Sequence, residues 1–127
     1  MKLRIKGDTV RFRVSPSGVK SLMREGSLTS QIRFSLHPNR SLLYSLVLDE
    51  NIHEPTVSFA GNEITARLPR GEAVHWASTD AVGLSREIQL DESSVLTLLV
   101  EKDFACLDLS DVENEDTYPN PNAGRAC

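Results

Sequence analysis

Four basic residues near the N-terminus have the spacing of a charged strand face. Charged and apolar residues alternate over 2–6 and again over 9–14, with Gly7-Asp8 between the two segments. Successive side chains of a strand point to opposite faces, so a two-residue turn at Gly7-Asp8 places the basic residues on one face and the apolar residues on the other. The candidate anion-binding residues are Lys2, Arg4, Arg11 and Arg13.

The predicted hairpin brings like charges together. Its register places Arg4 opposite Arg11 and Lys2 opposite Arg13. Like charges that are directly opposite destabilise a strand pair unless something neutralises them. The second predicted hairpin, over 56–67, carries serine, threonine and a single arginine at the matching positions. The positive face is therefore a property of one hairpin, and the fold does not require it.

Three interpretations of this face remain open. It is a solvated strand face whose long side chains cover apolar surface, or it is neutralised by the acidic segment 108–116, or it binds an external anion. Arginine suits a nucleic-acid backbone or a phosphorylated small molecule, and the expected partner is an anionic ligand or a protein. The net charge of −4 and the lack of aromatic side chains beside the basic residues disfavour nucleic acid.

Other motifs with chemical meaning are missing from the sequence. The three histidines have no metal-ligand spacing, and there is no phosphate-binding loop or nucleophile motif. Cys106 and Cys127 are expected as free thiols in a reducing compartment, and a bridge between them is the alternative on oxidation. We therefore predict no catalytic residue, metal or cofactor, and favour a binding or regulatory module. The alternatives are a structural interaction module and an enzyme for a phosphorylated small molecule. A buried Arg86 facing an acidic residue would favour the enzyme, and an Arg86 that points to solvent would disfavour it.

The elements that position the basic residues recur along the chain. A shift of 54 positions superposes the apolar pattern of the two halves, and Gly7-Asp8 then falls on Gly61-Asn62. Each half reads strand, turn, strand, helix, strand, strand, with helices starting at Ser15-Pro16 and at about Pro69. A repeat of this length indicates duplicated supersecondary units. We predict an α+β fold in which a tandem ββαββ duplication forms a mostly antiparallel sheet or squat barrel with two helices.

The domain organisation follows from the same pattern. Residues 1–103 form one domain made of two pseudo-repeats, 1–48 and 55–103, and 104–127 is an acidic C-terminal tail. The segments 41–48 and 94–100 carry apolar residues on both faces. Strands of this kind are covered on both sides, so we expect helices, the tail or a second subunit over them, and hence a homodimer.

Charge and hydropathy indicate the location and the partners. Apolar residues make up 39% and charged residues 25% of the chain, as in folded soluble domains. No apolar run is long enough to cross a membrane, and the charged N-terminus is not a signal peptide. We therefore expect a cytoplasmic protein. Residues 1–40 hold nine Lys or Arg and two Asp or Glu, so the positive charge is concentrated at one end.

One C-terminal motif carries a resemblance. The residues from Glu101 to Leu107 read Glu-Lys-Asp-Phe-Ala-Cys-Leu and precede an acidic run and Pro119-Asn120-Pro121. With the N-terminal Met-Lys-Leu-Arg-Ile-Lys-Gly and the region of Trp76, this resembles a family of small bacterial proteins of unknown function. The resemblance implies no activity, cofactor or catalytic residue. It implies a recurring feature, of unknown role, at Lys102, Asp103, Phe104 and Cys106.

Overall fold

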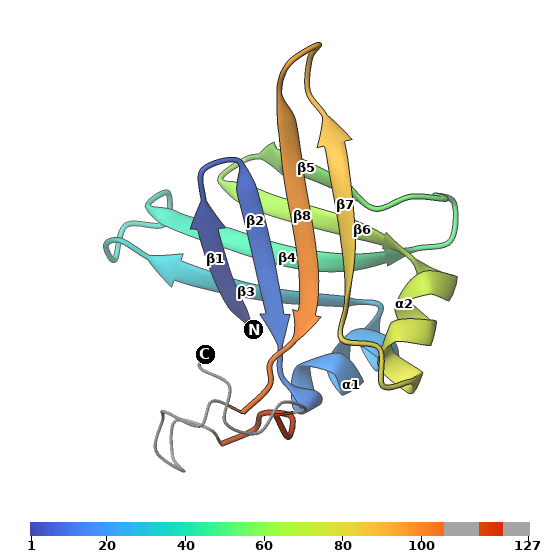
Figure 1. The fold of residues 1–127 in the computed structure, drawn as a ribbon. Coiled ribbons are helices and arrows are strands. Elements are labelled where there is room, and N and C mark those ends of the chain that lie inside the picture. Colours follow the sequence, from blue (N-terminus) through green and yellow to red (C-terminus); the bar gives the residue numbers. More distant parts are fainter. Residues whose placement is uncertain (106–114, 121–127) are drawn as a thin grey trace.

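The chain forms eight strands and two helices in the computed structural model, which describes residues 1–105 and 115–120 (Figure 1). The elements are β1 Lys2–Lys6, β2 Thr9–Val14, α1 Pro16–Glu25, β3 Ser27–Arg33, β4 Ser41–Asp49, β5 Thr56–Ala60, β6 Glu63–Pro69, α2 Arg70–Ser78, β7 Gly83–Gln89 and β8 Val95–Lys102. Neither helix is long and apolar enough to span a membrane. The predicted α+β class is confirmed.

The strands form two sheets of four. Sheet A has the order β1-β2-β8-β7, and sheet B has the order β3-β4-β6-β5. All four hairpins are antiparallel as predicted, but the central pairs β2–β8 and β4–β6 are parallel. Where one mostly antiparallel sheet or a squat barrel was expected, the strands form two mostly antiparallel sheets, because the hairpin that follows each helix joins the opposite sheet. The strands of the two sheets cross steeply face to face, with both helices at one end (Figure 1).

The two parallel pairs have equivalent registers. Thr9 lies opposite Thr97 in sheet A, and Glu63 lies opposite Leu43 in sheet B. The shift of 54 positions that relates the apolar patterns places Thr9 on Glu63 and Leu43 on Thr97, so the two pairs are equivalent. Strand pairing thus repeats the symmetry of the sequence pattern, with each sheet taking one hairpin from each half of the chain.

Helix α1 begins and ends at the expected residues. The hydroxyl of Ser15 accepts a hydrogen bond from the backbone N–H of Gly18 at 3.1 Å, as a helix-capping serine does. At the other end Gly26 has a φ of 82° and donates its N–H to the carbonyl of Leu22 at 2.9 Å. This left-handed conformation suits glycine, and it lets the chain turn directly into β3.

The core lies between the two sheets and extends under the helices. Trp76 of α2 and Leu22 of α1 occupy equivalent helical positions, and both are fully buried. The indole N–H of Trp76 donates to the carbonyl of Val82 at 3.1 Å, so this buried polar atom is satisfied. The buried apolar residues are Val10, Phe12, Val14, Val19, Leu22, Leu46, Leu48, Ala66, Leu68, Ala73, Trp76, Leu98 and Val100.

The outer faces of β4 and β8 differ from the expectation of complete cover. On each strand two inward apolar residues are buried, Leu46 and Leu48 on β4 and Leu98 and Val100 on β8, whereas the outward apolar residues are only half-buried. The helices lie at the end of the sandwich and do not cover these outer faces (Figure 1). The half-buried outward residues are Leu43, Val47, Val95 and Leu99.

Candidate anion-binding site

The hairpin β1–β2 places its basic residues on the outer face of sheet A. Gly7 adopts a φ of 53° in the two-residue turn, which favours glycine. Arg4 lies opposite Arg11 and Lys2 lies opposite Arg13, so the predicted register is confirmed. The alternate residues point inward, and Phe12 among them is fully buried. All four candidate residues therefore share one face.

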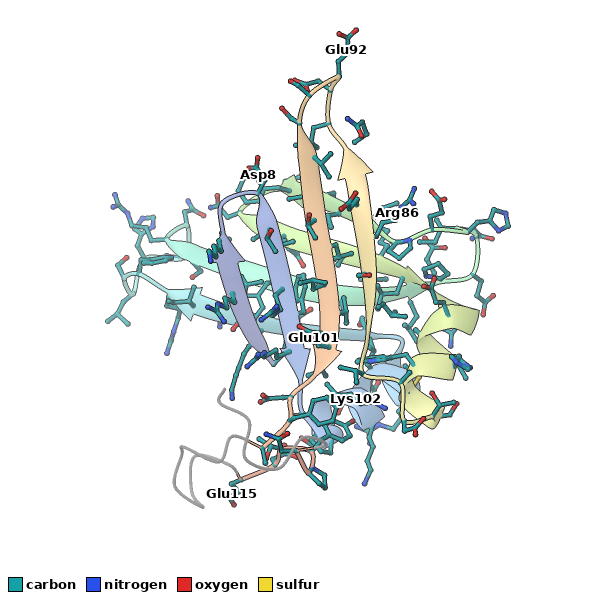
Figure 2. All side chains as sticks on the ribbon, viewed as in Figure 1. Asp8, Arg86, Glu92, Glu101, Lys102 and Glu115 are labelled. Atoms are coloured by element: carbon teal, nitrogen blue, oxygen red, sulfur yellow. The ribbon has the colours of Figure 1, made fainter. Side chains whose placement is uncertain are left out.

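Strand β8 brings a carboxylate to this face. Glu101, near the end of β8 (Figure 2), lies opposite Arg13 in the parallel register. Its Oε1 is 2.8 Å from Nε of Arg11. The two atoms are close enough for an ion pair, although they are not aligned as a hydrogen bond. Both side chains are less than a third exposed. Glu101 therefore partly neutralises the like-charge pair, which sequence reasoning missed because β2 and β8 are distant in the chain.

A second carboxylate holds the first residue of β1. The Nζ of Lys2 is 2.9 Å from Oδ2 of Asp103, whose side chain is 7% exposed. Backbone bonds fix Asp103 just after β8: its N–H donates to the carbonyl of Val14 at 2.9 Å, and its carbonyl accepts from Tyr118 at 2.7 Å. Two of the four candidate residues, Lys2 and Arg11, thus already have an acidic partner.

The rest of the positive charge faces solvent. No carboxylate of the described residues lies within 4 Å of the charged groups of Arg4, Lys6 or Arg13. A hollow of about 210 Å³ is lined by Arg4, Lys6, Thr9 and Arg11. Lys6 was not among the predicted site residues, although its alternation with Arg4 was a signal for it. We call Lys2, Arg4, Lys6, Arg11 and Arg13 the basic face.

The C-terminal motif packs at the end of sheet A. Lys102 is 6% exposed, and its Nζ donates to the carbonyl of Thr79 at 2.6 Å. The same Nζ lies 5.5 Å from the ring centre of Tyr118, whose ring is 5.7 Å from that of Phe104. Lys102 and Phe104 therefore connect β8 to residues 115–120 and lie away from the hollow. Cys106, also predicted for this motif, lies outside the described residues.

One acidic residue after the motif contacts helix α1. The carboxylate of Asp116 accepts hydrogen bonds from the hydroxyl of Ser17 at 2.5 Å and from its backbone N–H at 3.4 Å. The hydroxyl bond to Ser17 lowers the pKa of Asp116, and the N-terminus of a helix favours a negative charge. Asp116 is therefore bound to α1 and not to the basic face. Residues 106–114, which hold most of the acidic segment predicted to neutralise that face, lie outside the described residues.

Comparison with known proteins finds one family, whose match covers all the described residues. A model of a family of unknown function (DUF7009) matches residues 1–122. The chain belongs to this family. The match to DUF7009 spans both sheets. No curated protein and no solved structure matches the chain.

The geometry of Arg86 bears on the enzyme alternative. Its Nη2 lies 2.5 Å from Oε2 of Glu54, and the two side chains are 40% and 63% exposed. Arg86 thus faces an acidic residue at the surface and is not buried, unlike the arrangement that would favour the enzyme alternative (Figure 2). No group of three or more His, Cys, Asp or Glu residues within 1–105 and 115–120 is arranged to hold a metal ion.

Proposed function

We propose that this member of DUF7009 is a non-catalytic binding module whose basic face binds an anionic partner. The observation that carries the proposal is the hollow on sheet A, where Arg4 and Lys6 have no carboxylate within 4 Å among the described residues while they line one cavity with Arg11. The fold does not require this arrangement, because at the equivalent hairpin position Ser58 lies opposite Thr65.

The electrostatics of the hollow favour an anion with several negative oxygens. Arg4 and Arg11 are directly opposite, and Glu101 supplies only one negative charge to the pair. A phosphate or carboxylate in the hollow would neutralise the remaining charge and accept charge-assisted hydrogen bonds from the guanidinium groups. The hydroxyl of Thr9 lines the same cavity and adds an uncharged donor.

The acidic segment of the chain itself is the second occupant that we consider. Asp116 is bound to Ser17 and is therefore not available to the basic face in this arrangement. We favour a partner supplied by another molecule, since the described part of the segment is held at α1 by the bond from Ser17 to Asp116.

Several broader features belong to the same proposal. A tandem duplication would account for the equivalent registers of β2–β8 and β4–β6. The half-buried apolar residues on the outer faces of β4 and β8 would suit a homodimer contact. A bacterial origin is proposed from the resemblance, and a cytoplasmic location from the composition, which is that of a folded soluble domain.

The proposal is tested by titrating the ¹⁵N-labelled protein with inorganic tripolyphosphate and with a short poly-glutamate peptide. At least one probe should shift the amide signals of β1 and β2, and Arg4→Gln should weaken binding about tenfold. Arg67→Gln is the matched control, because Arg67 lies on the equivalent hairpin and is 3.6 Å from Asp49. Equal effects of the two substitutions, or no binding of either probe, would contradict the proposal.

A further inference from the structure

Strand β1 differs in charge from the other edge strands of the fold. The edges of the two sheets are β1, β7, β3 and β5. The outer face of β1 is positively charged at every position, namely at Lys2, Arg4 and Lys6. The outer faces of the other edges are largely uncharged: Gly83, Ser85, Glu87 and Gln89 on β7, Ser27, Thr29, Gln31 and Arg33 on β3, and Thr56, Ser58 and Ala60 on β5.

The free edge of β1 presents backbone groups that can pair. Residues that flank a two-residue turn form a hydrogen-bonded pair, and such pairs alternate along an antiparallel ladder. The backbone N–H and C=O groups of Lys6, Arg4 and Lys2 therefore bond to β2. Those of Leu3 and Ile5 point to the open edge. No backbone hydrogen bond joins β1 to a described residue outside β2. An edge of this kind is a template for another strand.

We propose that the anionic partner is an extended acidic peptide that adds to β1 as a fifth strand of sheet A. The inference rests on the proposed function and assigns the class of ligand. Carboxylates at alternate positions of the peptide would lie beside Lys2, Arg4 and Lys6. Apolar side chains at the intervening positions would lie beside Leu3 and beside Ile5, which is 60% exposed. Opposite charges and apolar pairs on adjacent strands both stabilise such pairing.

The positive charges of β1 disfavour a second copy of β1 as the partner. Two β1 strands side by side would place Lys2, Arg4 and Lys6 against equally charged residues, which is unfavourable. Natural edge strands use lysine to prevent association with other copies. A strand that carries carboxylates on the outer face does not meet this barrier, so charge selects the acidic partner.

The test uses a heptapeptide in which glutamate alternates with valine or threonine, in two N-methylated forms. One form is methylated at the glutamates and the other at the apolar residues. In an extended strand the N–H groups of alternate residues point to opposite edges, so only one set can bond to β1. Methylation of one set should therefore weaken binding at least tenfold, while methylation of the other leaves the affinity within about twofold.

Amide hydrogen exchange supplies a second readout. Binding of the unmethylated peptide should slow exchange at Leu3 and Ile5, whereas Val57 and Phe59 on the equivalent edge strand β5 should exchange as before. If both methylated forms bind equally and the Leu3 and Ile5 amides stay unprotected, strand addition is refuted while anion binding stands. If tripolyphosphate binds and the peptide does not, only this inference fails. If neither binds, the proposed function fails as well.

Discussion

Removing one charge from the basic face should stabilise the unliganded protein while it weakens anion binding. We choose Arg4→Gln, because glutamine keeps most of the length of the side chain and loses only its charge. Arg4 is opposite Arg11 and has no carboxylate within 4 Å among the described residues. Its substitution therefore relieves repulsion and breaks no ion pair.

The size of the effect follows from the register. Opposed side chains on paired strands hold their charges about 6 Å apart. At that distance two unit charges in water repel by about 0.7 kcal/mol. A Debye length of about 8 Å at physiological salt reduces this repulsion to about 0.3 kcal/mol. Glu101, 2.8 Å from Arg11, lowers the value further, and neighbouring Lys2 and Lys6 raise it. We expect a gain in the free energy of unfolding of about 0.3–0.7 kcal/mol, largest at low salt.

Urea denaturation at low salt and at about 1 M salt measures this gain, because the Debye length at the higher concentration is about 3 Å. The gain of Arg4→Gln should nearly vanish at high salt. Arg67→Gln is the control and should not stabilise the protein, since Arg67 lies beside Asp49. A loss of stability in Arg4→Gln at low salt, or a gain that salt does not reduce, would refute the electrostatic account of the basic face.

Three further predictions concern the fold. Trp76→Phe should lower the free energy of unfolding by about 1–2 kcal/mol in urea denaturation, because it removes core volume and the hydrogen bond to the Val82 carbonyl; unchanged stability would contradict the packing. Gly26→Ala should cost about 1 kcal/mol because φ is 82°, whereas Gly71→Ala, where an added Cβ meets nothing within 4 Å, should not destabilise the protein in the same assay. The pKa of Asp116 is lowered from 3.8, so its bonds to Ser17 are fully present above pH 3.8 and are lost as the pH falls through the lower folded pKa. The amide NMR signal of Ser17 should report this transition, and a signal that does not change with acidification would contradict it.

The local features of the fold could be predicted from the sequence because each depends on residues a few positions apart. The turn at Gly7-Asp8 determines that Arg4 meets Arg11, and alternation determines that both point to the same face. The cap at Ser15 and the left-handed conformation of Gly26 likewise define the two ends of helix α1. The structure therefore confirms the predicted hairpin register, the predicted ends of α1 and the prediction that the four basic residues share one face.

By itself, then, the sequence determined the hairpins, the helices and the positive face of β1 and β2. Only the tertiary structure decided which hairpins share a sheet, and so which carboxylates reach the positive face. The parallel pairing of β2 with β8 brings Glu101 to Arg11 and Asp103 to Lys2, and leaves Arg4 unpaired among the described residues. The physical reason is that this pairing is non-local. Burial of Phe12 and Val100 between the crossing sheets fixes it, and no short-range pattern in the chain encodes that packing.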